Sequence, residues 1–309
     1  MKMHLISLSK LASLLLMTTL MGTQSLSGQT KKINRLDFKT AQDLKTYFKY
    51  TEGNQIIVSG HRGGNEPGFP ENSIEGLQNV LTQMPAMFEI DPRLTKDSVI
   101  VLMHDATLDR TTTGKGELKD HMWKELQSVR LKDHSGRITK YKIPTLEEVI
   151  KWSKGKTIVN LDKKDVPMWM IAALIKRLHG ERNVMLTVHN GTEARYYYDR
   201  FPNIMMSAFV RNTKEYEDIC KAGVPWCNII AYIGTSLNAE NQKIYETLHS
   251  KGVRCMISLA PTDDKLATSA ERAAKYKEEI NTKPDIIESD IPTEVWRALQ
   301  TSLNKQTTC

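Results

Sequence analysis

The chain has few cysteines, and their spacing does not suit a metal site. Its 309 residues include Cys220, Cys227, Cys255 and Cys309, without the closely spaced pairs typical of zinc sites. The glycine-rich fingerprint of dinucleotide-binding folds is also absent. Four cysteines allow three disulfide pairings, and nothing in their positions selects one, so we assign no disulfide.

Two further classes are disfavoured by charge and hydropathy. The formal net charge of +7 is spread along the chain, and no basic run with interleaved aromatic residues indicates nucleic-acid binding. The apolar run Leu11–Met21 is shorter than the roughly 20 residues that a transmembrane helix needs, and no other stretch is long enough. We therefore expect neither a nucleic-acid partner nor a stable membrane span.

The start of the chain is typical of an export signal. Lys2 and Lys10 precede the apolar run Leu11–Met21, and the small and polar residues Ser25–Gly28 follow it. This order predicts a signal peptide over residues 1–27 and an exported protein, periplasmic or secreted. Its removal takes away two lysines and no acid, which lowers the formal net charge from +7 to +5.

The rest of the chain alternates between strand-like and helical patterns. Residues 28–53 form a lead-in with one predicted helix, and residues 54–305 carry short apolar runs separated by amphipathic segments. If residues 88–103 are one strand with a hairpin arm, there are eight βα units, which favours a closed (β/α)8 TIM barrel over an open sheet. Residues 107–144 are polar and rich in turns, so we expect a small insertion after the second strand, on the catalytic rim.

Acidic side chains follow two of the predicted strands. Glu89 and Asp91 are two residues apart and project to the same side of a strand, as do Asp162 and Lys164 if their strand continues that far. Catalytic groups of a barrel lie at the carboxyl ends of its strands, so three carboxylates converge there. Such crowding of like charges is costly unless a cation neutralises it, which predicts a divalent metal ion.

Two histidines each follow an apolar run and precede a charged residue. His61 and His104 form a candidate acid–base pair, and Arg62 offers a guanidinium fork for phosphate oxygens. Glu71 ends a loop rich in glycine and proline, where it is either a site residue or a complement to the dipole of the next helix. The remaining histidines lack such partners and are interpreted as surface or structural, although His189 also ends a predicted strand.

These motifs in this order resemble the glycerophosphodiester phosphodiesterase family. The resemblance runs from about Ile56 to Pro292 and rests on the following segments: His61-Arg62-Gly63, Pro70-Glu71-Asn72-Ser73, Glu89-Ile90-Asp91, His104-Asp105 and Leu108-Asp109-Arg110-Thr111-Thr112. It implies a TIM barrel that hydrolyses glycerophosphodiesters to sn-glycerol 3-phosphate and an alcohol, a phosphoric diester hydrolase activity.

The resemblance also implies roles for individual residues. It implies one divalent cation, Mg²⁺ or Ca²⁺, held by Glu89, Asp91 and Asp162. It implies that His61 and His104 act as general acid and base, in an order that the sequence leaves open. Phosphate binding would fall to Arg62 and Lys164, and Glu71 is carried over as a further substrate-binding or phosphate-binding residue.

Departures from the family pattern keep two alternatives open. Asp162 stands where glutamate is usual, and residues 257–262 lack a tryptophan that many members place against the glycerol. Aspartate at that position also occurs in the related sphingomyelinase D-like phospholipases, which are one alternative function. The other is a non-catalytic periplasmic protein that binds small phosphate esters. The sequence does not indicate the oligomeric state.

Overall fold

The structure is a computed structural model that describes residues 33–306. The predicted signal peptide over residues 1–27 and Cys309 lie outside the described residues. Within the described part, Cys220, Cys227 and Cys255 are free thiols. No helix in that part combines the length and the apolar character needed to cross a bilayer.

Eight parallel strands close into a barrel, as the sequence pattern predicts. The barrel strands are β1 (Ile57–Gly60), β2 (Met87–Ile90), β5 (Val159–Leu161), β6 (Val184–Val188), β7 (Met205–Phe209), β8 (Ile229–Gly234), β9 (Cys255–Ser258) and β10 (Ile286–Ser289). The first strand closes the ring because it pairs with β2 on one side and with β10 on the other. Since every pair is parallel, all the carboxyl ends of the strands meet at one end of the barrel.

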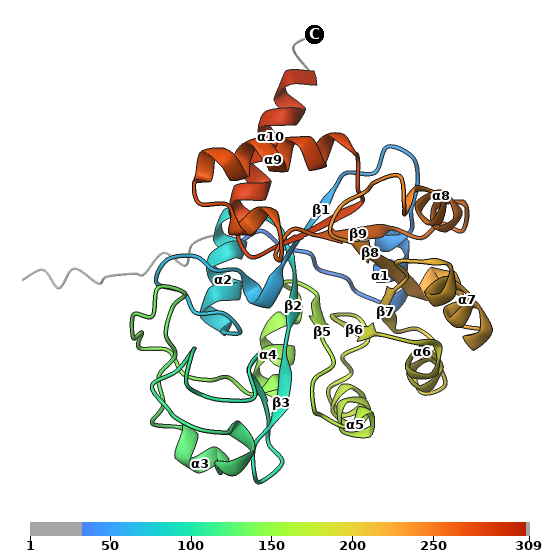
Figure 1. The fold of residues 1–309 in the computed structure, drawn as a ribbon. Coiled ribbons are helices and arrows are strands. Elements are labelled where there is room, and N and C mark those ends of the chain that lie inside the picture. The colour runs from blue at the N-terminus through green and yellow to red at the C-terminus, as the bar shows by residue number, and fades with distance from the viewer. Residues whose placement is uncertain (1–32, 307–309) are drawn as a thin grey trace, which may run out of the picture. The chain divides into compact units, whose positions relative to one another are not determined.

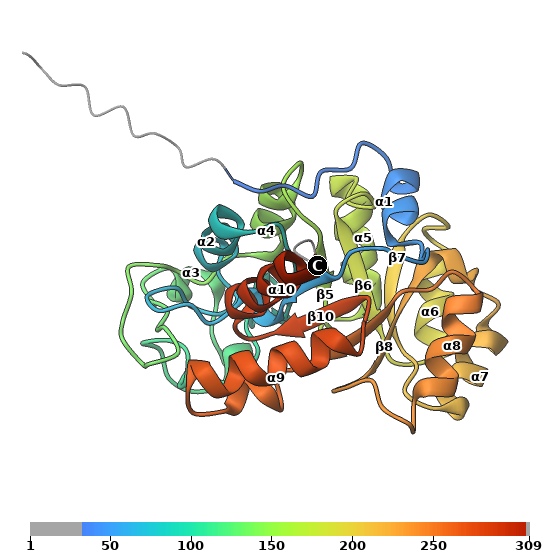
Figure 2. The same cartoon turned by 90° about the horizontal axis from the view of Figure 1, so that it is seen from above.

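Helices surround the barrel, on its outside and at one end (Figure 1). They are α1 (Ala41–Phe48), α2 (Ile74–Gln83), α4 (Leu146–Ser153), α5 (Met168–Leu178), α6 (Gly191–Tyr198), α7 (Thr213–Ala222), α8 (Gln242–Ser250), α9 (Ser269–Asn281) and α10 (Pro292–Gln306). Figure 2 shows the last of these lying over β10, where α10 contacts β1, α2 and α9. Several helices begin at a side-chain cap; for example, the hydroxyl of Ser73 accepts a hydrogen bond from the Gly76 amide.

The interior of the barrel has two layers of opposite character. The lower layer is apolar and consists of Ile57, Met87, Ile158, Met185, Met205, Ile230, Met256 and Ile286. Leu44 and Phe48 of α1 pack against it and close that end of the barrel. Two residues further along most of these strands the inward side chains are polar, and they are Glu89, Asn160, Thr187, Ser207, Tyr232, Ser258 and Glu288. The period of two along a strand therefore stacks a polar layer on an apolar one.

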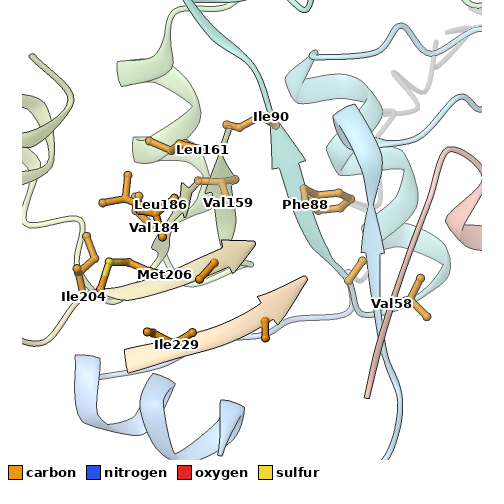
Figure 3. Close-up of a cluster of buried hydrophobic side chains, with 14 of the residues drawn as sticks. Val58, Phe88, Ile90, Val159, Leu161, Val184, Leu186, Ile204, Met206 and Ile229 are labelled. Carbon is orange, nitrogen blue, oxygen red and sulfur yellow. The ribbon is translucent and has the colours of Figure 1, made fainter. Parts of the chain in front are cut away.

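Side chains on the opposite face of the strands form the main core. Figure 3 shows part of it, including Val58, Phe88, Val159 and Leu186. These residues are almost completely buried between the barrel and its helices. Burial on both faces explains why the lower half of each strand carries apolar residues at inward and outward positions alike.

A hairpin and an irregular segment follow β2. β3 (Pro92–Leu94) continues from β2 outside the barrel and pairs antiparallel with β4 (Ile100–Leu102). Residues 107–144 then form mostly loops, with the short helix α3 (Trp123–Leu126), visible in green in Figure 1. Apolar side chains of this segment, among them Leu108, Leu118, Leu131 and Ile143, form a separate cluster with Val101 of β4.

Candidate active site

The polar layer of the barrel opens into a cavity of about 820 Å³. Its wall includes the predicted site residues His61, Arg62, Glu71, Glu89 and Asp162. The cavity is large enough for a small organic substrate, since ligand pockets are typically about 300–1,000 Å³. It lies at the carboxyl ends of the strands, where the chemistry of a barrel is expected.

His61 is held at the end of β1 by a carboxylate from β10. Its Nδ1 lies 2.7 Å from Asp290 Oδ1, and its Nε2 lies 3.9 Å from Glu89 Oε2. Burial by itself lowers the pKa of His61, but the hydrogen bond with Asp290 and the nearby carboxylates of Glu89 and Glu288 outweigh it and raise the pKa to about 9. The Asp290 contact fixes the ring and leaves the other nitrogen facing the acidic residues.

Three carboxylates from β2 and the end of β5 converge beside His61. One oxygen from each of Glu89, Asp91 and Asp162 lies within 4.8 Å of the other two. Burial and the adjacent Asp91 raise the pKa of Glu89 well above its usual value. Burial alone would raise the pKa of Asp91 too, but Lys164 and a hydrogen bond from Asn72 hold it below its usual value.

The donor atoms of this group fit a hard divalent cation. All three are carboxylate oxygens, the ligand type that Mg²⁺ and Ca²⁺ prefer. Asp91 Oδ1 is buried without a hydrogen-bond partner of good geometry, although Lys164 Nζ lies 3.0 Å away. A buried carboxylate oxygen without a good hydrogen bond, in a group of crowded acids, is energetically costly unless a bound cation lies against it.

Two residues with positive φ build the loop around these acids. Arg62 (φ 53°) donates its backbone N–H to Glu89 Oε2 at 2.9 Å. Asn72 (φ 54°) donates to Asp91 Oδ2 at 2.6 Å and accepts from the Asp91 amide at 3.0 Å. Backbone strain at residues other than glycine is typical of functional sites, and here it orients two of the three carboxylates.

His104 is oriented by a chain of charged groups. Its Nδ1 lies 2.8 Å from Asp105 Oδ1, and Arg110 donates two hydrogen bonds to Asp105, of 2.7 and 2.9 Å. Arg110 also donates two bonds to Glu71, of 2.9 and 2.8 Å. His104 does not line the cavity itself, but it is close enough to Asp91 to help lower the pKa of that carboxyl.

Glu71 lies between two arginines. Besides its two bonds from Arg110, it accepts a longer contact of 3.5 Å from Arg62 Nη1. The side chain is almost fully buried, so these cations provide the charge balance that a buried carboxylate needs. The structure therefore places Glu71 in the wall of the cavity, where it positions Arg62 and Arg110.

Lys164 lies between two acids of the cluster. Its Nζ is 2.6 Å from Asp162 Oδ2 and 3.0 Å from Asp91 Oδ1. β5 ends at Leu161, so the loop that follows it, and not a continued strand, brings Lys164 to Asp162. His189 also lies near this point, with Nε2 3.9 Å from Asp162 Oδ1 and its ring 4.5 Å from that of Phe209.

The structure adds site residues that the sequence interpretation had not selected. Asp290, Glu288, Asp105 and Arg110 all contact or neighbour the predicted groups. Glu288 and Asp290 are two residues apart at the end of β10. This is the same signal that identified Glu89 and Asp91, and it could have identified this second pair.

A second mixed group, whose residues do not line the cavity, is explained by its internal bonds. His249, Cys255 and Asp285 have potential ligand atoms within 4.8 Å of one another. Asp285 Oδ2 is 2.7 Å from His249 Nε2 and accepts a bond of 2.7 Å from the Cys255 amide. The ring of Tyr50 stacks on that of His249, with 3.5 Å between the ring centroids. These contacts connect the starts of β9 and β10 to α8 and to the segment before β1.

Comparison with known proteins finds a family match over most of the chain. Residues 61–257 match the model of the glycerophosphoryl diester phosphodiesterase family. The chain belongs to this family. Its members are phosphoric diester hydrolases, and the matched segment begins at His61 and includes the three clustered acids.

Solved and curated members of the family show how far the similarity extends. A glycerophosphoryl diester phosphodiesterase from Parabacteroides distasonis is 49% identical, with a TM-score of 0.86, over 88% of this chain and 95% of the other. A curated glycerophosphodiester phosphodiesterase from Caldanaerobacter subterraneus is 34% identical over 36% of this chain and 46% of its own length. An Oleispira antarctica phosphodiesterase, crystallised with the product sn-glycerol-3-phosphate, shares the fold at 20% identity and a TM-score of 0.60, over 83% of this chain and 99% of the other. The chain spans about half the length of several curated relatives that it matches.

Proposed function

We propose that this protein hydrolyses glycerophosphodiesters to sn-glycerol 3-phosphate and an alcohol, with a divalent cation as cofactor. The observation that carries the proposal is the convergence of Glu89, Asp91 and Asp162 beside His61 and Arg62 at the mouth of the barrel. A phosphodiester needs charge neutralisation and two proton transfers, and this set of side chains supplies both. The product complex of the Oleispira relative supports the choice of glycerol phosphate esters.

Glu89, Asp91 and Asp162 would hold the cation, Mg²⁺ or Ca²⁺. Bound there, it would polarise the phosphoryl oxygens and neutralise their charge. Arg62 binds the phosphate from the side of β1, and Lys164 does so from the loop after β5. Arg62 is suited to this because its Nε has no hydrogen-bond partner in the part of the chain that the structure describes.

The two histidines move the protons. His61 faces the polar interior of the barrel. A cation held by Glu89 and its neighbours would offset the carboxylate charge that raises the pKa of His61, and the neutral ring then takes a proton from the attacking hydroxyl or water through Nε2, while Asp290 stabilises the resulting imidazolium. His104 protonates the oxygen of the leaving alcohol, and Asp105 holds its Nδ1–H. Each transfer typically contributes about 10² to 10⁴ in rate.

The proposal includes export of the protein. The order of basic, apolar and small residues in segment 1–27 supports it. Fractionation of a Gram-negative host that expresses the full chain should place the shortened protein in the periplasm or medium. Full-length protein that stays in the cytoplasmic fraction would contradict export.

The activity is tested by product analysis with purified protein. Glycerophosphocholine, glycerophosphoinositol and sphingomyelin are supplied with Mg²⁺, with Ca²⁺, or with a chelator. We expect sn-glycerol 3-phosphate from the two glycerophosphodiesters only, loss of product with chelator, and loss in His61→Ala and His104→Ala. His121→Ala, which alters a histidine outside the cavity lining, is the matched control. Product from sphingomyelin alone, or full activity of both variants, would refute the proposal.

A further inference from the structure

We infer that the rim of the cavity holds a subsite for a second anionic group, carried by the leaving alcohol of the substrate, and that Lys132 is its principal cation. The inference rests on the proposed function and narrows its substrate class to diesters whose alcohol bears a carboxylate or phosphate. It concerns the segment 129–142, here called the rim hairpin. Residues 132–136 of this hairpin line the cavity.

Most cations around the cavity are already neutralised by carboxylates. Arg110 is bonded to Glu71 and Asp105. Arg211 is bonded to Glu215, Lys265 is bonded to Asp290, and Arg62 lies 3.5 Å from Glu71. In each of these pairs the guanidinium or ammonium already faces an acid, which reduces its attraction for a further anion.

Lys132 differs from these cations. The contact of its Nζ is the backbone carbonyl of Asp109, at 3.2 Å, and none of the described residues places a carboxylate within ion-pair distance of it. The side chain is half-buried in the cavity wall. A carbonyl orients the ammonium without neutralising it, so its full charge is available to a ligand in the cavity.

The rim hairpin is strongly basic as a whole. It contains Arg130, Lys132, Arg137, Lys140 and Lys142 against a single acid, Asp133. Asp133 is paired with Arg137 at 2.8 Å, so the remaining four cations are not balanced by any acid of the hairpin. Among these cations Lys132 lines the cavity, and the positive charge of the hairpin around it favours an anion there over a neutral or cationic group.

Internal bonds hold the hairpin in place over the cavity. Asp133 is buried and accepts hydrogen bonds from the amide of Gly68 at 3.0 Å and from Ser135 and Arg137. The amide of Lys132 donates to the Thr111 carbonyl at 2.7 Å. The subsite is therefore preformed, which reduces the entropy lost when a ligand binds.

The position of the rim hairpin indicates that the subsite contacts the alcohol part of the substrate and not the glycerol part. The inner part of the cavity carries Glu288, Ser258 and other hydroxyl or acidic groups, which suit a polyol and repel a further anion. On the other side, the hairpin adjoins Thr111 and Arg110, and Arg110 connects through Asp105 to His104. Since His104 protonates the leaving oxygen in the proposed mechanism, the alcohol extends toward the hairpin.

The test uses two diesters that differ by one carboxylate, glycerophosphoserine and glycerophosphoethanolamine. The quantity measured is the ratio of their kcat/KM values. We expect wild type to prefer the serine diester by about 3- to 5-fold, the effect of one partly exposed charge pair. Lys132→Met should bring the ratio close to unity, and Lys132→Arg should retain the preference. Lys124→Met, which removes an exposed lysine of α3 outside the cavity lining, should keep the wild-type ratio.

The outcomes separate this inference from the proposed function. A wild-type ratio of one, or an equal change of the ratio in Lys132→Met and Lys124→Met, would overturn the subsite while leaving the hydrolase activity in place. If neither diester is hydrolysed, the proposed function fails. Calorimetric titration with the same two diesters then decides the subsite: tighter binding of the serine diester by wild type but not by Lys132→Met supports it, and equal binding overturns it.

Discussion

Replacing Asp105 with asparagine tests whether His104 depends on its charged neighbour. Asp105→Asn preserves the size of the side chain and removes the negative charge that lies 2.8 Å from His104 Nδ1. Hydrogen bonds from Arg110 and His104 hold the pKa of Asp105 below its usual range, although burial opposes them, so the carboxylate is ionised at neutral pH. The substitution therefore removes a charge-assisted hydrogen bond from the candidate acid.

The expected magnitude follows from the strength of that bond. A hydrogen bond to a charged group contributes about 1.5–3 kcal/mol, and the lower end applies because Asp105 is partly exposed. About 1.4 kcal/mol corresponds to a tenfold change in rate, so kcat should fall about 10-fold while KM changes little. Removal of the whole imidazole in His104→Ala should lower kcat further, by a factor of about 10² to 10⁴.

The assay is steady-state hydrolysis of glycerophosphocholine, with thermal unfolding measured on the same samples. Asp109→Asn is the matched control, because Asp109 is exposed in the same loop and pairs with Lys115. Arg110→Ala should lower kcat as well, and the double variant with Asp105→Asn should be no slower than the worse single variant, because both act through His104. A wild-type kcat in Asp105→Asn, or an equal loss in Asp109→Asn, would refute the reasoning.

Three further predictions concern the metal, the pH dependence and the apolar end of the barrel. Glu89→Gln should weaken binding of Mg²⁺ or Ca²⁺ at least 10-fold in calorimetry without lowering the unfolding temperature of the metal-free protein, because burial and Asp91 already raise the pKa of that carboxyl; unchanged affinity would count against the metal site. In metal-free protein, the folded-state pKa of His61 is about 9, above the 6.5 of an unfolded chain, so the contribution of its protonation to stability is complete below pH 6.5 and is lost as the pH rises through 9. Urea unfolding from pH 6 to 10 should show this decline in the free energy of unfolding of wild type and a smaller decline in Asp290→Asn. Parallel curves for the two proteins would contradict the prediction. Leu44→Ala should lower the free energy of unfolding by about 2–5 kcal/mol with kcat retained, because the side chain is fully buried far from the polar layer; a loss of kcat without a loss of stability would contradict the separation of the two layers.

The fold could be predicted because the residue pattern of its strands and helices reflects how each of them is buried. Runs such as 229–233, Ile-Ile-Ala-Tyr-Ile, are apolar throughout, which indicates a strand covered on both faces, and the helices between the strands are amphipathic. The hairpin after β2 also follows from the sequence pattern of residues 88–103. The loops of segment 107–144 could be located but not described, because their course depends on long-range contacts such as that between Asp133 and the Gly68 amide.

The candidate site was only partly predictable for a related reason. Glu89 and Asp91 share a strand, so the period of two identifies them as neighbours. The partner of His61 is Asp290, 229 positions away along the chain, and only the closure of β10 onto β1 brings the two together. Arg110 was visible as part of a motif, but its simultaneous bonds to Glu71 and Asp105 depend on how the insertion folds over the rim.

Because a polar layer is stacked on an apolar one inside the barrel, substitutions in the two layers have different consequences as the sequence evolves. Four of the eight inward residues in the lower half are methionines, whose unbranched thioether side chains adapt to neighbours of changed shape. Sequence drift there alters how readily the chain reaches its native state, yet leaves the reacting groups where they are. New substrate preferences can then arise by exchange of side chains in the upper half and on the rim, without redesign of the scaffold beneath.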